Sequence, residues 1–403
     1  MKGDPYRSPL AVLRFAPLLF VFLVACAAPS AVAPEASDAP GAAFVTRLGS
    51  DTLAVERFAR TPTGMTATVA LRAPRTTLTT YDLVLGPDGD LVRYEAVTRQ
   101  PLTDEVLRRE IAEPSGDSLR VTQRPTDEPE TVRMVALTER ALPFIDMVHW
   151  PFEIMVERAV EAGGPLDQPL FTSRGLVAFT SDVEDDGAVT VRHPFRGPMT
   201  VEADARGRLV SLDAGQTTRA LVVTRVGEVE VEQAATRWAE MDAAGQSVGA
   251  LSGRGETVAE VAGATISVDY GQPLRRDRDI WGALVSWGDL WRTGANQATH
   301  LTTDRDLVLG EGADALTVPA GTYTLFSIPQ PDGGTLIVNR ETGQNGNRYD
   351  ESQDLGRVPM QRQSLDASTE AFTIDVEASG GGAGVLSLRW AEDAFRVPFS
   401  VRD

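Results

Sequence analysis

The chain has 403 residues, with 38 Lys and Arg against 57 Asp and Glu, and its formal net charge is −19 at pH 7. A chain this acidic has no general affinity for nucleic acid or for anionic lipid surfaces, because both are bound through excess positive charge. Cys26 is the only cysteine, so no disulfide within the chain can hold the fold. The length is sufficient for two domains, each with its own hydrophobic core.

Residues 1–25 have the pattern of a secretory signal peptide. The basic residues Lys2, Arg7 and Arg14 precede an apolar run from Phe15 to Ala25. Eleven helical residues rise about 16 Å, which is well short of the ~30 Å hydrocarbon core of a bilayer. The run is therefore predicted to be the apolar part of a signal peptide and not a membrane span.

The apolar run ends in Leu23-Val24-Ala25-Cys26. This sequence resembles the lipobox of bacterial lipoproteins, and the resemblance implies cleavage before Cys26 and acylation of this cysteine by fatty acids such as palmitate. The alternative is an ordinary secretory signal cleaved near Ala28. Ala27 follows the cysteine where an aspartate would suggest retention in the inner membrane, so we expect an outer-membrane anchor, with the protein facing the periplasm or the cell surface. Residues 26–43 are rich in Ala, Pro and Ser and predict a disordered tether.

Residues 44–250 alternate short apolar–polar segments with turn sequences such as Gly86–Asp90. Helical periodicity interrupts this pattern near residues 151–162 and 229–244. We expect a curved, half-barrel-like antiparallel sheet with both helices on its concave side. In architecture alone, this is similar to the lipoprotein-carrier half-barrels of the bacterial envelope.

Residues 255–403 show little helical periodicity, and an antiparallel β-sandwich is predicted for them. The expected strands are residues 265–269, 298–303, 322–328, 335–339, 371–377, 385–390 and 395–401.

Three of the six tryptophans, Trp281, Trp287 and Trp291, lie close together and are followed by the polar residues Arg292, Asn296 and His300. The spacing fits neither a helix nor a strand throughout, so residues 278–293 are expected to form a structured loop with one helical turn near Leu290. One interpretation is that the rings plug an open end of the sandwich while the polar groups satisfy turn carbonyls and amides. The other is a ligand-binding site, in which the rings offer a stacking platform and the polar groups offer hydrogen bonds, as in sugar-binding sites.

Three long motifs run through this part of the chain: W-R-T-G-A-N-Q-A-T at 291–299, V-P-A-G-T-Y-T-L-F-S-I-P at 318–329 and L-I-V-N-R at 336–340. With these motifs, residues 265–401 resemble the bacterial family called domain of unknown function 2911. Members often carry a tryptophan before glycine in the loop after the third motif, whereas this chain has Gln344-Asn345-Gly346. The family name implies no activity, so no catalytic residue can be transferred.

The sequence predicts no catalytic residue, no metal site and no cofactor. The three histidines, His149, His193 and His300, are not spaced as zinc ligands, and no G-x-S-x-G elbow stands before a helix. We therefore expect a lipid-anchored envelope protein that binds a ligand or protein partner without catalysis. The alternatives are an enzyme acting on an envelope polysaccharide or peptidoglycan through residues 291–300, and a structural or assembly lipoprotein.

Overall fold

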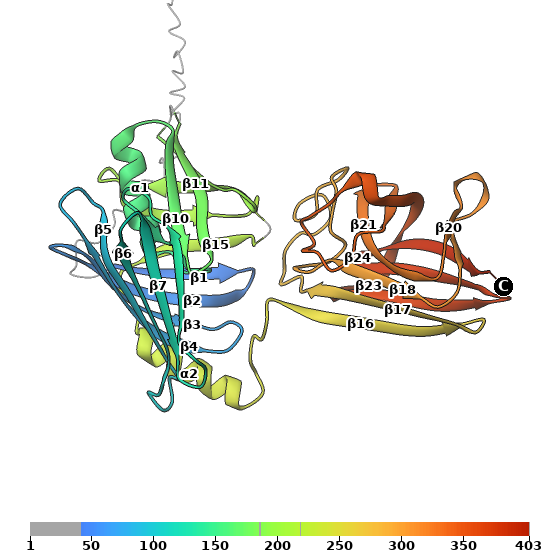
Figure 1. Ribbon diagram of the computed structural model, residues 1–403, viewed down its shortest axis with the longest axis horizontal. Helices are drawn as coiled ribbons and strands as arrows, with labels where there is room; N and C mark the ends of the chain where they lie inside the picture. Colours follow the sequence, from blue (N-terminus) through green and yellow to red (C-terminus); the bar gives the residue numbers. More distant parts are fainter. Residues whose placement is uncertain (1–41, 185–186, 218, 403) are drawn as a thin grey trace, which may run out of the picture. The chain divides into compact units, whose positions relative to one another are not determined.

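The computed structural model describes residues 42–184, 187–217 and 219–402. Within these ranges every strand belongs to one of two sheets, of fifteen and nine strands, and two α-helices accompany them (Figure 1). The predicted mainly β class is confirmed. The lipobox and the tether up to residue 41 lie outside the described residues.

The first sheet is formed by the fifteen N-terminal strands of the described residues. They are β1 (Ala42–Leu48), β2 (Asp51–Thr61), β3 (Gly64–Leu71), β4 (Thr77–Leu85), β5 (Leu91–Arg99), β6 (Val106–Ser115), β7 (Ser118–Pro125), β8 (Thr131–Ala136), β9 (Leu142–Pro143), β10 (Leu166–Thr172), β11 (Gly175–Val183), β12 (Val189–His193), β13 (Gly197–Ala203), β14 (Leu209–Asp213) and β15 (Leu221–Val226).

Two meanders meet in the middle of this sheet. The strands run in the order β8 to β1 and then β15 down to β9, and β1 pairs with β15 through the register Val45 opposite Thr224. Each pairing is antiparallel except that of β9 with β10, which is parallel. The twist of so many strands curves the sheet around one hydrophobic core, which includes Phe44, Leu83 and Phe179. The expected curved, open sheet is confirmed.

Helix α1 (Trp150–Ala162) belongs to the core inside this curve. It begins beside a buried carboxylate. Both oxygens of Glu56 accept the backbone N–H of His149 at 2.9 Å, and Glu56 Oε2 also accepts that of Trp150 at 2.9 Å. The Glu56 carboxylate satisfies backbone N–H groups that the first turn of the helix leaves free. Its position at this end also interacts favourably with the positive end of the helix dipole. The helix ends at Gly163, which has a φ of 65°.

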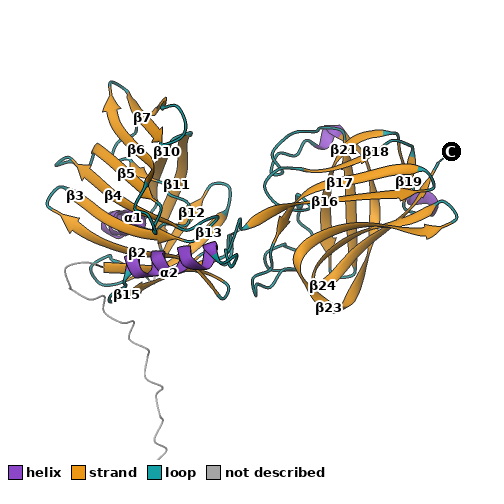
Figure 2. Ribbon diagram, turned by 90° about the horizontal axis from the view of Figure 1, so that it is seen from below, coloured by secondary structure: helices purple, strands orange, loops and turns teal. Residues whose placement is uncertain are grey.

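Helix α2 (Val231–Ala243) packs on the opposite face of the same sheet. Its apolar residues contact Val55 and Ala70, whereas the preceding residues Ala54 and Val69 point into the core around α1. Because side chains alternate between the two faces of a strand, the two helices lie on different faces (Figure 2). The expectation that both helices lie on the concave side is therefore wrong for α2. Helical periodicity identifies which face of a helix is apolar, but not which face of the sheet it covers.

The second sheet is formed by the nine C-terminal strands of the described residues. They are β16 (Ser252–Val261), β17 (Ala264–Pro273), β18 (Thr299–Thr303), β19 (Leu307–Leu309), β20 (Leu316–Val318), β21 (Gly321–Gln330), β22 (Gly333–Asn339), β23 (Asp354–Gly380) and β24 (Ala383–Val401); two short 3-10 helices, η1 (Gly312–Asp314) and η2 (Glu351–Gln353), interrupt them.

This sheet folds over itself into the predicted β-sandwich. Its order is β16-β17-β18-β21-β22-β23-β24-β19-β20, and β23 and β24 are long enough to bend from one layer into the other (Figure 2). The late part of β23 then lies across the core from β16 and β17: Thr257 Oγ1 donates to the carbonyl oxygen of Ile374, and the rings of Tyr270 and Phe372 lie 5.7 Å apart.

Three details of this sandwich differ from the sequence-based expectation. Strands β16 and β20 are additional to the expected ones, and residues 385–390 and 395–401 belong to one strand, β24. Residues 278–293 form the expected loop, but the helical turn near Leu290 is not present. In β16, mostly half-buried residues alternate with exposed ones. The strand therefore lacks the run of apolar residues from which a strand is predicted.

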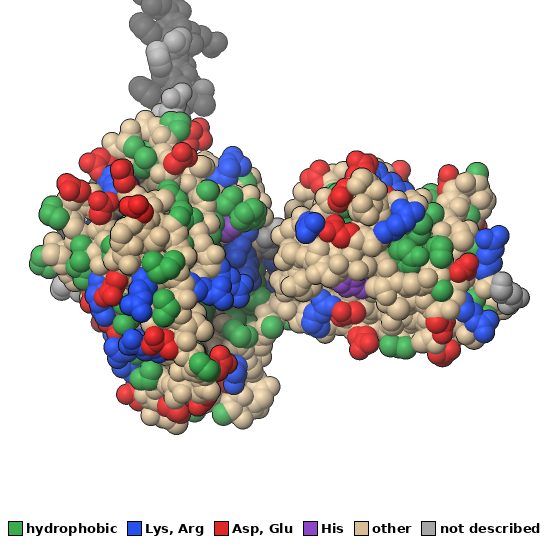
Figure 3. Space-filling view, viewed as in Figure 1, with side chains coloured by type: hydrophobic (Ala, Val, Ile, Leu, Met, Phe, Trp, Pro, Cys, Tyr) green, Lys and Arg blue, Asp and Glu red, His purple; other side chains and the backbone are tan. Residues whose placement is uncertain are grey.

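Arginines and carboxylates are interspersed on the face of the molecule seen in Figure 3. Many of them pair across neighbouring strands, such as Arg109 of β6 with Glu95 of β5. Exposed pairs of this kind contribute little to stability, about 0–1 kcal/mol each. Buried arginines without such partners are therefore the more informative ones.

Candidate functional site

An aromatic cluster fills the loop between β17 and β18. The rings of Trp281 and Trp287 are stacked with centroids 6.3 Å apart, and those of Trp291 and Trp390 are stacked at 6.1 Å. Trp281 Nε1 donates to the carbonyl oxygen of Trp390 at 3.0 Å, so the polar atom of this ring is satisfied. The three loop tryptophans are partly buried and pack against the sandwich core. This packing fits the plug interpretation of the cluster.

The W-R-T-G-A-N-Q-A-T segment is fixed to β21 by hydrogen bonds. Trp291 and Ser327 exchange two backbone hydrogen bonds of 2.7 and 2.9 Å, and the hydroxyls of Thr293 and Ser327 lie 2.8 Å apart. Thr299 Oγ1 donates to the carbonyl oxygen of Thr293 at 2.7 Å. The segment therefore has one defined position, and several of its motif residues serve to hold it there.

Two glycines allow this segment to approach its neighbours closely. A Cβ atom on Gly271 would lie 1.7 Å from the carbonyl oxygen of Ala295, a distance that no side chain can occupy. A Cβ atom on Gly346 would lie 3.0 Å from both Arg292 Cδ and the carbonyl oxygen of Asn296. The glycine of the Tyr270-Gly271 pair is thus required by packing of the loop against β17.

Arg278 and Arg292 are half-buried charged groups of this loop. Arg278 Nε donates to the carbonyl oxygen of Arg275 at 2.9 Å, while Arg292 donates to the carbonyl oxygen of Gly294 at 3.3 Å and to Asn347 Oδ1 at 2.6 Å. Neither forms an ion pair with a carboxylate of the described residues. Burial lowers the pKa of Arg278 to about 10 and also lowers the pKa of Arg292, which reflects the cost of holding these charges away from water.

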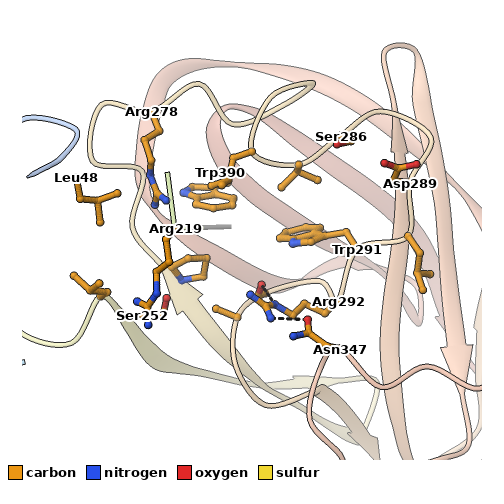
Figure 4. Close-up of a pocket in the computed structure, with 17 residues that line it drawn as sticks. Leu48, Arg219, Ser252, Arg278, Ser286, Asp289, Trp291, Arg292, Asn347 and Trp390 are labelled. Atoms are coloured by element: carbon orange, nitrogen blue, oxygen red, sulfur yellow. Dashed lines mark hydrogen bonds between the residues drawn. The ribbon is translucent and has the colours of Figure 1, made fainter. Parts of the chain in front are cut away.

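Both guanidinium groups lie at one hollow. Figure 4 shows Arg278 and Arg292 around the same space as the indoles of Trp291 and Trp390. Ser286 and Asp289, together with Asn347, add exposed polar groups to its lining. The hollow thus combines two arginines and one exposed carboxylate, Asp289, with flat apolar walls. The arginines are suited to bind a carboxylate or phosphate group of a small molecule.

Asn296 and His300 lie away from this hollow, so the three polar residues predicted as a cluster do not converge. Asn296 is exposed, and its backbone carbonyl oxygen accepts the N–H of Gly346 at 2.9 Å. His300 Nε2 accepts the N–H of Gly343 at 3.0 Å, and burial lowers its pKa. Both hold the 343–347 loop in place, as the satisfied-turn interpretation expects. Their role in ligand binding stays a prediction.

Trp287 has a cation on one ring face. The guanidinium carbon of Arg362 lies 5.0 Å from the ring centroid, and Arg362 also binds Asp393 through two hydrogen bonds of 2.9 and 2.8 Å. Because Asp393 neutralises Arg362, this arginine differs from Arg278 and Arg292. It fixes the ring and offers no free charge.

Three residues that line the hollow are not predicted as site residues from the sequence. Trp390 stands about a hundred positions from the tryptophan cluster along the chain, and only folding of β24 brings it there. Arg278 lies in the charged run R-R-D-R-D, which is typical of a solvated surface. Asn347 lies in the loop where this chain departs from the tryptophan-containing pattern, and this loop does contribute to the hollow. This departure from the family pattern is the one feature of the sequence that points to a role for the loop of Asn347.

The C-terminal part of the chain matches a known protein family. Residues 252–399 match the family described as protein of unknown function, DUF2911. The match begins at residue 252, just before residue 255, where the sandwich is expected to begin from the sequence. It includes β16, so all strands of the sandwich fall within the matched region or at its end. A search of curated proteins gave no match.

The described residues also lack three features that would indicate other kinds of site. They contain no group of three or more His, Cys, Asp or Glu side chains arranged to hold a metal ion. They contain no helix long and apolar enough to cross a membrane. The sequence G-Q-S-V-G at 245–249 follows α2 and leads into β16, so it is not the strand–turn–helix elbow of a hydrolase, and Ser247 is exposed.

Proposed function

We propose that this protein is a lipid-anchored cell-envelope protein whose C-terminal sandwich binds a small anionic ligand, an acidic saccharide, without catalysis. The observation that carries the proposal is the pair Arg278 and Arg292, which are half-buried at a hollow and form no ion pair with a carboxylate of the described residues.

Taking a charged group partly out of water without a counterion costs free energy. Carbonyl contacts satisfy the N–H groups of a guanidinium without neutralising its charge, so they offset this cost only in part. A chain with 57 acidic residues has ample carboxylates for pairing, yet none forms an ion pair with these two arginines in the described residues. A carboxylate or phosphate entering the hollow would supply the missing charge, and Arg is the side chain best suited to bind it through two parallel hydrogen bonds.

The walls favour a saccharide as the bearer of that charge. Trp291, which is partly exposed and stacks on the buried ring of Trp390, offers flat apolar surface, and Ser286, Asp289 and Asn347 offer hydrogen bonds to hydroxyls. A wholly apolar anion would leave these polar groups unused. An acidic sugar of the cell envelope uses the charges, the rings and the polar groups together.

Titration calorimetry with N-acetylmuramic acid tests this directly. Its neutral counterpart, N-acetylglucosamine, lacks the carboxylate-bearing lactyl group and is the matched control ligand. We expect the acid to bind at least about tenfold more tightly, since a charge-assisted hydrogen bond contributes roughly 1.5–3 kcal/mol. Arg292→Gln should remove most of this difference and leave the weak binding of the neutral sugar unchanged.

Arg402→Gln is the matched control variant, because it removes an arginine near the end of the same sandwich that does not line the hollow. It should bind both sugars as the wild type does. Equal affinity for the two sugars, or an acid preference that survives both Arg278→Gln and Arg292→Gln, would refute the proposal.

The anchor is proposed from the Leu23–Cys26 lipobox sequence. Several acyl chains, at about 0.8 kcal/mol per buried CH₂, would hold the protein durably in a bilayer leaflet. Mass spectrometry of the protein isolated from its native membrane should find an acylated Cys26 as the first residue, and Cys26→Ala should release the protein from the membrane fraction. An unmodified amino terminus near Ala28 would instead indicate ordinary secretion.

A further inference from the structure

A second cavity lies within the N-terminal sheet. Its volume is about 200 Å³, somewhat larger than the ~150 Å³ cavity that accommodates benzene in another protein. Strands β4 to β7 form its floor, and residues 143–146 and 171–173 form its wall. Phe144 and Phe171 contribute apolar surface to that wall.

The pairing register brings polar residues together on the floor of this cavity. Ala96 of β5 pairs with Glu110 of β6, which in turn pairs with Gln123 of β7; in the next row, Thr98 pairs with Arg108. These residues alternate along their strands, so all of them point to the inner face. Most of the rest of this face is apolar and belongs to the core, with a few buried polar side chains such as Glu56. A polar row here is not required for packing.

Tyr94 offers the cavity a hydroxyl group that forms no hydrogen bond with the described residues. Burial of the ring raises the pKa of Tyr94 well above its ordinary value, so the hydroxyl keeps its proton at neutral pH and can act as a donor. A hydrogen bond from this donor to a bound acceptor would contribute about 0.5–1.5 kcal/mol.

One cation and one anion stand side by side on the floor. Arg108 and Glu110 are two positions apart on β6 and point the same way. Arg108 forms no ion pair with the described residues, and Glu110 accepts one hydrogen bond from Gln123 Nε2 through Oε2. Asp146, which also lines the cavity, is already paired with Arg196 and Arg219. The charges that remain for a ligand are one positive and one negative.

We infer that this cavity binds a compact zwitterion with an apolar body, in the simplest case an aromatic α-amino acid. The ligand carboxylate accepts hydrogen bonds from Arg108 and the Tyr94 hydroxyl, and its ammonium group donates to Glu110. Its side chain packs among the rings of Tyr81, Phe144 and Phe171. A simple anion would meet repulsion from Glu110, and a simple cation would meet repulsion from Arg108.

The test uses full-length protein and three probes that differ in one group each. L-Phenylalanine carries both charges, 3-phenylpropionate lacks the ammonium group and 2-phenylethylamine lacks the carboxylate. Calorimetry should show L-phenylalanine binding at least about tenfold more tightly than either analogue. Arg108→Gln and Tyr94→Phe should each weaken L-phenylalanine about tenfold, and Arg108→Gln should not weaken 2-phenylethylamine.

Arg109→Gln is the matched control, because Arg109 is the next residue on β6, points to the opposite face and pairs with Glu95. It should bind L-phenylalanine as the wild type does. Absence of L-phenylalanine binding, equal binding of the three probes, or unchanged affinity in both Arg108→Gln and Tyr94→Phe would overturn the inference. Since these variants lie in the other sheet, the result is separate from the sugar experiment on Arg278 and Arg292.

Discussion

His193 shows how burial at a single residue makes stability depend on pH. Its ring is 6% exposed and lies 4.9 Å from the ring of Phe179, and its Nδ1 accepts the N–H of Phe195 at 3.1 Å. Burial, aided by the charge of Arg196 and opposed by Asp146, lowers the pKa of His193 from 6.5 to about 4. The native state therefore holds the neutral ring, and the unfolded state binds a proton more readily.

We predict that His193 contributes to acid destabilisation between about pH 6.5 and pH 4. Its contribution to stability is complete above pH 6.5 and is lost as the pH falls, because only the unfolded chain gains the proton. Between pH 7 and pH 4.5, urea unfolding should show a loss of stability in the wild type that exceeds the loss in His193→Gln by roughly 2 kcal/mol. An identical loss in both proteins would show that this ring does not couple folding to protonation.

A second prediction at the scale of single residues concerns Gly271. Gly271→Ala should lower the free energy of unfolding by about 2–3 kcal/mol, because its Cβ would collide with the carbonyl oxygen of Ala295 and displace the 291–299 segment. Gly253→Ala is the control, since Gly253 lies on the paired strand β16 and a Cβ atom there would have no other atom within 4 Å. Chemical denaturation should find the control within about 0.5 kcal/mol of wild type. Equal effects in the two variants would contradict the packing role of Gly271.

At the scale of elements, helix α2 and its sheet form a small core of their own. Trp238 is 6% exposed and packs with Val55 and Ala70 on the face of the sheet opposite to α1. This second core explains how one sheet can bury apolar residues on both of its faces. It also means that loosening α2 need not disturb the core around α1.

Trp238→Ala is predicted to destabilise the protein by about 3 kcal/mol, through lost burial and the cavity left behind. Arg237→Ala, at the neighbouring exposed position of the same helix, should change the free energy of unfolding by no more than about 0.5 kcal/mol. Thermal and urea unfolding followed by circular dichroism measure both. A small effect of Trp238→Ala would mean that α2 is not held to the sheet by this ring.

Elements that carry strong periodicity are predictable from the sequence. The helix expected near 151–162 is observed at Trp150–Ala162, and the one expected near 229–244 at Val231–Ala243. Strand β16 and the first half of β23 are not, because their polar, half-exposed residues resemble loops. The placement of α2 is not predictable either, because the choice between two apolar sheet faces depends on contacts distant in sequence.

At the scale of the whole molecule, the candidate site is predictable in part. The tryptophans and Arg292 are identified by their clustering, whereas Arg278 and Trp390 become neighbours of Arg292 only through the fold. Asn296 and His300 are predicted to lie with Arg292 because they are close to it in sequence, yet neither lines the hollow. What distinguishes Arg278 and Arg292 is the absence of carboxylate partners in the described residues, and a sequence cannot display that property.

The central claim is that the sandwich uses these two arginines to bind an acidic sugar. A crystal structure of the protein with N-acetylmuramic acid tests it most directly. The account predicts the lactyl carboxylate within about 3 Å of a guanidinium nitrogen of Arg278 or Arg292, with the sugar ring against Trp291. A structure at saturating ligand in which this hollow holds only water would contradict the claim.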